Sequence, residues 1–161
     1  MIAVTDTSPI CYLILISEVE LLPKLFNQVL APHAVIAELL HADAPEAVRA
    51  WASNLPSWIA VREIPAGSAA GMEKLQSGEQ GAILLAQEMQ AEIVLIDEKS
   101  ARRVAADRGL RVTGTLGLLG EAASRGLLEL APAIDRLSKT SFRYSPALLK
   151  SVLDRFDKRS P

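Results

Sequence analysis

Short apolar runs alternate along the chain with longer segments in which apolar residues recur every three or four positions. Each run has the length of a buried strand, and the longer spacing is that of one face of a helix. The runs predict strands at residues 2–5, 28–31, 58–63, 92–96 and 110–113. The longer segments predict helices at residues 9–16, 18–26, 32–41, 45–55, 78–90, 98–108, 115–125 and 132–138. This alternation favours an α/β fold, in which a mainly parallel central sheet lies between two layers of helices.

A further helix is predicted by "SPALLKSVLDRF", with Ser145 as N-cap and Pro146 at its first position. Its apolar positions form one stripe, made of Leu148, Leu149, Val152, Leu153 and Phe156. We expect this stripe to pack on the sheet of its own chain. The alternative is that part of the apolar helical surface is shared between two copies of the chain.

The composition is that of one globular domain, which we expect to span residues 1–161. Half of the residues are hydrophobic and 22% are charged, which excludes a disordered chain. The net charge of −2 excludes a protein with a generally basic, nucleic-acid-coating surface, but it is compatible with a local basic patch.

Cysteine and histidine are too rare for a disulfide framework or a zinc site. Cys11 is the only cysteine, and His33 and His41 are the only histidines. We therefore expect a protein of the reducing cytoplasm. The apolar run at 9–16 is too short to span a membrane and no basic segment precedes it, so we expect no signal peptide.

The first apolar run ends on a carboxylate, Asp6, which Thr7, Ser8 and Pro9 follow. A structural explanation exists, because Ser8 before Pro9 is typical of a helix N-cap, and Asp6 then only precedes the helix. The functional explanation is that an aspartate at the carboxyl end of a strand faces the crevice in which open α/β sheets bind ligands.

Three more acids lie near helix starts or within helices, and each also has a structural explanation. Asp97 ends the run "IVLID" and could cap the next helix. Glu79 lies in "SGEQGAILLA", where Ser77 and Gln80 have capping-box spacing and a first-turn acid suits the helix dipole. Glu38, in "AVIAELL", could be a solvated position on an amphipathic helix. The glycine-rich "GTLGLLG" lacks the spacing of a nucleotide-binding loop, and we expect Thr115 within it to cap a helix.

Taken together, the four acids favour a cation site. Asp6 and Asp97 both end strands of a parallel sheet and therefore lie at the same edge. Carboxylates gathered in one crevice repel one another unless a divalent cation neutralises them, and oxygen ligands suit Mg²⁺ or Mn²⁺ rather than zinc. Such a site can activate water for in-line attack on a phosphodiester.

The motifs "VTDTSPI", "VIAELL", "SGEQGAILLA" and "LIDEKSARRVAADRGLRVTGTLGLL" together resemble those of PIN-domain proteins. The resemblance is greatest to the prokaryotic group related to VapC-type toxins, and it extends to "FRYSPALLKSVLDRF" near the C-terminal end. It implies a three-layer α/β/α sandwich with a parallel sheet. It also implies a metal-dependent nuclease that cuts single-stranded RNA.

The resemblance implies a role for each site residue. The hydroxyl beside the first aspartate is then Thr7 or Ser8. The acidic quartet that binds Mg²⁺ or Mn²⁺ and supports catalysis is then Asp6, Glu38, Glu79 and Asp97.

Two positions depart from the PIN pattern. Glu79 stands where many PIN nucleases have aspartate. Lys99 stands where an acid often follows the fourth carboxylate, and we expect the adjacent Glu98 to point elsewhere.

A basic helix face follows the fourth acid. Lys99, Arg102 and Arg103 share this face by their spacing, and they lie in early turns, where the helix dipole disfavours cations. Binding of RNA phosphates is one explanation. The other is an ordinary solvated face, or ion pairs with Asp107 and Glu98.

Together with the acidic residues, this resemblance to VapC-type PIN proteins implies a Mg²⁺- or Mn²⁺-dependent endoribonuclease, a hydrolase that acts as the toxin of a toxin–antitoxin pair. Its predicted partners are RNA, an antitoxin protein and a second copy in a homodimer formed through helices, with no membrane association. The alternative is a PIN-fold binding protein with little or no nuclease activity. Binding of a divalent metal distinguishes the two.

Overall fold

A five-stranded sheet forms the centre of the computed structural model, which describes residues 1–64, 67 and 69–156. Its strands are all parallel, in the order β3-β2-β1-β4-β5. Each lies within or closely matches a segment predicted from the apolar runs, and the predicted α/β class is confirmed. The strands are β1 (Ile2–Thr5), β2 (Gln28–Pro32), β3 (Ile59–Arg62), β4 (Ile93–Leu95) and β5 (Val112–Thr113).

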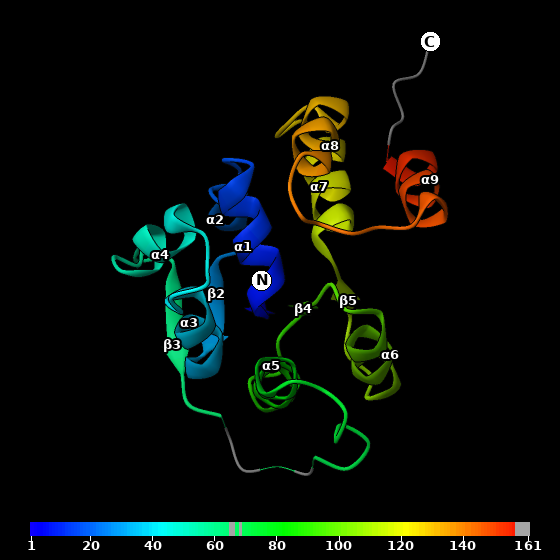
Figure 1. Cartoon of the computed structure of the whole chain (residues 1–161). Coiled ribbons are helices and arrows are strands. Elements are labelled where there is room, and N and C mark those ends of the chain that lie inside the picture. Colours follow the sequence, from blue (N-terminus) through cyan, green and yellow to red (C-terminus); the bar gives the residue numbers. More distant parts are fainter. Residues whose placement is uncertain (65–66, 68, 157–161) are drawn as a thin grey trace.

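The helices of the described residues connect the strands and continue after the last one (Figure 1). Each overlaps a predicted helix, with bounds that differ by a few residues. They are α1 (Thr7–Leu15), α2 (Leu21–Leu25), α3 (His33–Leu39), α4 (Glu46–Ala52), α5 (Ser77–Glu88), α6 (Lys99–Asp107), α7 (Thr115–Ser124), α8 (Leu130–Ser138) and α9 (Pro146–Phe156).

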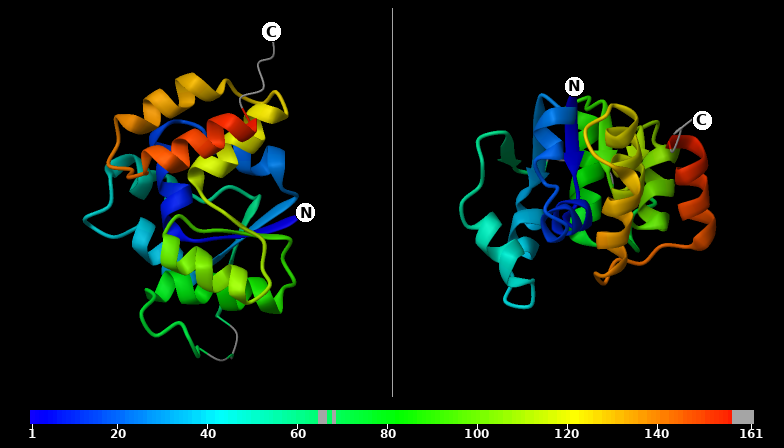
Figure 2. Two further views of the ribbon diagram at one scale, coloured as in Figure 1. Left: turned by 90° about the vertical axis from the view of Figure 1, so that its right-hand side faces the viewer. Right: turned by 90° about the horizontal axis from the view of Figure 1, so that it is seen from above.

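The sheet separates two hydrophobic cores, because successive strand residues point to opposite faces. Ala3 and Leu95 belong to the core under α1, α2, α7 and α8, whereas Val4 and Val94 belong to the core under α5 and α6. Figure 2 shows these helix layers on the two sides of the strands. The structure is therefore the three-layer α/β/α sandwich that the sequence predicts.

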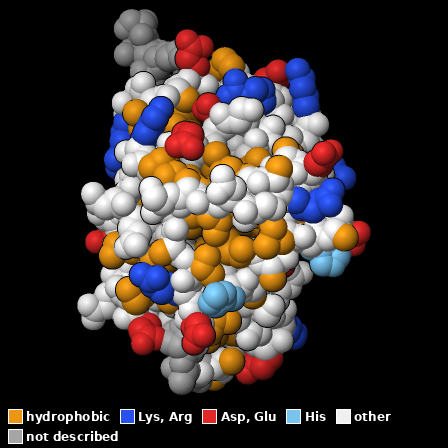
Figure 3. All heavy atoms as spheres, turned by 90° about the vertical axis from the view of Figure 1, so that its left-hand side faces the viewer, with side chains coloured by type: hydrophobic (Ala, Val, Ile, Leu, Met, Phe, Trp, Pro, Cys, Tyr) orange, Lys and Arg blue, Asp and Glu red, His pale blue; other side chains and the backbone are white. Residues whose placement is uncertain are grey.

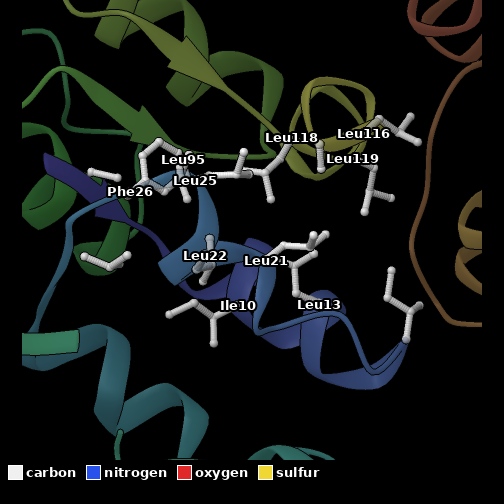
Figure 4. Close-up of a cluster of buried hydrophobic side chains, with 14 of the residues drawn as sticks. Ile10, Leu13, Leu21, Leu22, Leu25, Phe26, Leu95, Leu116, Leu118 and Leu119 are labelled. Carbon is white, nitrogen blue, oxygen red and sulfur yellow. The ribbon is translucent and has the colours of Figure 1, made fainter. Parts of the chain in front are cut away.

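The larger core joins the N-terminal helices to the C-terminal part of the chain. Ile10 and Leu13 of α1 and Leu22 of α2 are fully or almost fully buried, and they lie in one cluster with Leu116 and Leu119 of α7 (Figure 4). This packing fixes α1 and α7 relative to each other. Both helices begin at the carboxyl edge of the sheet, so their first residues are brought to the same place.

The apolar stripe of the last helix packs on another helix, whereas we expected it to pack on the sheet. α9 lies along α7 on the outside of the molecule (Figure 2). Gly120 of α7 makes the contact possible, since a Cβ atom there would lie 2.3 Å from Cδ2 of Phe156. Val152 is buried in this contact, while Leu148, Leu149 and Leu153 are partly buried.

The remaining predictions about individual segments concern loops and rare residues. The predicted loop at 65–71 lies partly outside the described residues; its described positions belong to no helix or strand. His33 and His41 are exposed, and Cys11 is partly buried beside the larger core. Within the described part of the chain, no helix is long and apolar enough to cross a membrane.

Candidate active site

The order of the strands reverses between β1, the central strand of the sheet, and its neighbour β4. β2 and β3 extend from one side of β1, and β4 and β5 from the other. In open parallel sheets, ligands bind outside the carboxyl ends of the strands at such a switch point. Asp6 directly follows β1 and Asp97 lies two residues after β4, so both acids are at this point. A hydrogen bond of 2.9 Å from the Asp6 N–H to the Leu95 carbonyl ties the two strand ends together.

Asp6 is the most buried acid of the site, with only 6% of its surface exposed. Its pKa is raised from 3.8 to about 7, chiefly because burial removes water from the carboxylate. A hydrogen bond from the Thr7 backbone acts in the opposite direction, and the charges of Glu79, Glu38 and Asp97 raise the pKa further. A side chain with these properties is costly to ionise without a cation.

Glu38 lies on α3, which follows β2, and its side chain lies close to that of Asp6. Its Oε2 accepts a 2.6 Å hydrogen bond from the Thr7 hydroxyl. A Cβ atom on Gly78 would lie 3.0 Å from both Oδ1 of Asp6 and Oε1 of Glu38. These two oxygens are therefore at most about 6 Å apart, with the backbone of Gly78 beside them. Glu38 is thus not a solvated helix position but a member of the cluster.

Asp97 does not cap the helix that follows it; Glu98 is the N-cap of α6. The Asp97 carboxylate instead accepts hydrogen bonds at the start of α7, from the Thr115 N–H at 2.6 Å and the Thr115 hydroxyl at 2.7 Å. The Ser8 hydroxyl donates a third bond, of 2.7 Å. Asp97 therefore holds the starts of α1 and α7 together.

Two capping predictions are wrong for the same reason. Ser8 is not the N-cap of α1, because Asp6 occupies that position and Ser8 lies inside the helix. Thr115 is not the N-cap of α7, which is Gly114. Both hydroxyl groups donate hydrogen bonds to Asp97, which is distant from them in the sequence.

Glu79 takes part in a capping box at the start of α5, one residue earlier in the sequence than the box predicted there. The capping box of α5 consists of Gln76 and Glu79, not Ser77 and Gln80, and Oε1 of Glu79 accepts a 3.0 Å bond from the Gln76 N–H. Glu79 is nevertheless 7% exposed, and burial raises its pKa. The nearby charges of Glu98 and Glu38 raise it further, so Glu79 also belongs to the electrostatic cluster.

The structure thus brings Asp6, Glu38, Glu79 and Asp97 to one edge of the sheet, with Thr7 and Ser8 as donors to two of them. Sequence reasoning did not anticipate that the charge of the exposed Glu98 contributes to the raised pKa of Glu79. It also missed Gly78 as the residue that lets two carboxylates approach. The signal for Gly78 was its position directly before Glu79.

The basic face of α6 divides between two environments. Arg102 donates a hydrogen bond to the backbone carbonyl of Asp97 and lies in the wall of a cavity with Lys99. Arg103 is exposed and does not line that cavity. The ion pairs found among the described residues involve neither Asp107 nor Glu98, so the alternative of ion pairing on this face gains no support.

The donors of the cluster suit a hard divalent cation. In residues 1–64, 67 and 69–156, no three His, Cys, Asp or Glu side chains converge as a complete metal site. Mg²⁺, however, is usually held by one or two carboxylates and keeps several waters. Asp6 and Glu38 are two carboxylates that could hold such an ion.

A comparison with protein-family models agrees with this geometry. Residues 2–158 match the family DUF3368, which is described as a PIN domain. The chain therefore belongs to the PIN-domain proteins, whose fold is generally that of a nuclease. Searches of curated proteins and of solved structures gave no match.

Proposed function

We propose that the protein is an endoribonuclease that cuts single-stranded RNA with the help of Mg²⁺ or Mn²⁺. One observation carries this proposal: Asp6, Glu38, Glu79 and Asp97 lie at the edge of the sheet beside the switch point, and no basic side chain of the described residues forms an ion pair with any of them. Uncompensated carboxylates at a ligand-binding crevice are suited to a divalent cation.

The residues of the chain have separate tasks in this proposal. Asp6 and Glu38, whose oxygens both lie beside Gly78, hold the cation in this proposal, and Asp97 and Glu79 add negative charge. A bound divalent cation supplies activation of water and neutralises charge on the phosphodiester. Thr7 orients Glu38, and Ser8 and Thr115 orient Asp97, through the hydrogen bonds described above. Lys99, Arg102 and Arg103 of α6 bind RNA phosphates in this proposal.

We also propose that the protein is a VapC-like toxin whose partner is an antitoxin protein, and that it forms a homodimer in the cytoplasm. An apolar area supports a protein interface: hydrophobic atoms gather in the middle of the face shown in Figure 3. Leu40 and Ile64 are among the large apolar side chains that remain exposed, at 45% and 43%. A monomer mass over a hundredfold dilution series, measured by light scattering, would contradict the dimer.

A second candidate function is a PIN-fold binding protein without useful nuclease activity. It is favoured by the hydrogen bonds of Asp97, whose two oxygens already accept three bonds within the protein. Glu79 is likewise engaged as a helix cap.

Cleavage of a labelled single-stranded RNA distinguishes the two functions. The purified protein should cut the RNA with Mg²⁺ or Mn²⁺ and should be inactive with EDTA. Asp6→Asn and Glu38→Gln should each abolish cleavage and remain folded, whereas Asp107→Asn, a change at an exposed aspartate, should leave it unchanged. Cleavage that persists in EDTA, or in both site variants, would refute the proposal.

A further inference from the structure

A cavity of about 790 Å³ begins at the edge of the carboxylate cluster and extends away from it. Its walls are β5 and the start of α6 on one side and α7 and α9 on the other. Of the four acids of the candidate site, Asp97 alone lines the cavity, together with the adjacent Gly114. Tyr144, residues of α9 and, from the amino end of the sheet, Met1 and Phe26 also line the cavity. A ligand in this cavity would therefore touch the site at one end only.

The cavity is basic, although the whole chain has a net charge of −2. Six basic side chains line it, against three acidic ones: Asp97, Glu98 and Glu121. Only Arg125 of the basic set takes part in an ion pair found among the described residues, with Glu121 at 3.1 Å. The basic residues are Lys99, Arg102, Arg111, Arg125, Arg143 and Arg155.

Aromatic rings stand next to these cations. Phe142 and Tyr144, which flank Arg143 in the sequence, both line the cavity. Their ring centroids are 5.9 Å apart. Phe142 is held from behind by Tyr12 of α1, with an edge contact at 4.9 Å. Tyr144 is partly exposed. Cations that follow a groove, with an aromatic ring among them, are the combination that binds single-stranded nucleic acids through phosphates and base stacking.

We propose that this cavity binds the RNA strand on one side of the cut position, with Arg111 and Arg143 on its phosphates and Tyr144 stacked on a base. The inference rests on the proposed function, because it takes the carboxylates as the place where the strand is cut. A basic groove also suits an acidic protein segment. The aromatic ring among the cations and the continuity with Asp97 favour RNA.

Binding without cleavage tests the inference separately from the nuclease activity. The probe is a fluorescein-labelled single strand of about 12 uridines, and its anisotropy is measured in EDTA. The double variant Arg111→Ala/Arg143→Ala should raise the dissociation constant about tenfold or more and should reduce the slope of log K against log salt by about 1.4. Tyr144→Leu should weaken binding about tenfold without changing that slope.

The control is Arg49→Ala/Arg62→Ala, which removes two exposed arginines near the opposite edge of the sheet. It should bind as the parent does. Equal losses of RNA affinity in both double variants, or no loss in either, would overturn the inference. Binding of an oligoglutamate peptide in this cavity, without binding of the RNA, would also overturn it. Groove-dependent binding by a protein that never cuts RNA would support the cavity as an RNA site and would refute the proposed nuclease instead.

Discussion

The buried carboxyl group of Asp6 makes the stability of the metal-free protein depend on pH. Its pKa is about 7 in the folded state, against an ordinary aspartate value of 3.8 for the unfolded chain, so the folded state binds the proton more tightly. Stability is highest below the unfolded pKa and falls as the pH rises through the folded pKa. A pKa difference of about 3 between the folded and unfolded states corresponds to at most about 4 kcal/mol in the free energy of unfolding. This stability is lost as the pH rises from about 4 to about 7 to 8.

The variant Asp6→Asn removes this titration and keeps an oxygen that can accept the Thr7 N–H bond. In EDTA at about pH 8.5 it should be more stable than the parent, by about 2 to 4 kcal/mol in the free energy of unfolding. At about pH 4, where the folded-state aspartate is protonated and the unfolded one is near its own pKa, the two proteins should be almost equally stable.

Urea unfolding followed by circular dichroism, at a series of pH values between about 4 and 9, measures this difference. Asp107→Asn is the matched control, because Asp107 is exposed at the end of α6. A variant that is less stable than the parent at every pH would show that Asp6 has a purely structural role. A difference independent of pH would also refute the reasoning.

Three further predictions concern the contacts around the cluster. Gly78→Ala should shift the Asp6 and Glu38 oxygens and slow cleavage, whereas Gly81→Ala on the same helix, which meets Ile64 and Pro32 but no carboxylate, should not slow it; RNA cleavage assays measure both. Thr115→Val should lower the free energy of unfolding by about 1 to 3 kcal/mol in urea titrations, because Asp97 loses a buried donor, and an unchanged midpoint would contradict this. Phe156→Ala should lower the free energy of unfolding by up to about 3 kcal/mol in the same measurement, because it removes the ring of α9 that packs on Gly120. An unchanged free energy would mean that α9 is not anchored there.

The fold could be predicted from the sequence because its signals are local. Apolar runs such as 92–96 and the periodic helices determine the α/β class, and their order determines a parallel sheet. The packing of α9 could not be predicted in the same way. Its stripe requires an apolar partner, but only the structure shows that Gly120 of α7 provides the space.

The candidate site could be predicted in part. Asp6 and Asp97 follow apolar runs, and topology alone places them at one edge. Their hydrogen bonds were not predictable, because Ser8 and Thr115 have good local explanations as caps while their actual partner, Asp97, is far along the chain. The same holds for Glu98, whose effect on Glu79 depends on how α6 and α5 approach each other.

The central claim is that the carboxylate cluster holds a divalent cation, and titration with Mn²⁺ followed by electron paramagnetic resonance tests it most directly. With micromolar protein at about pH 8, the account predicts saturable binding of Mn²⁺ that Mg²⁺ displaces. Asp6→Asn should weaken this binding by at least about tenfold, whereas Asp107→Asn should not change it. No saturable binding, or equal binding by the parent and Asp6→Asn, would contradict the account.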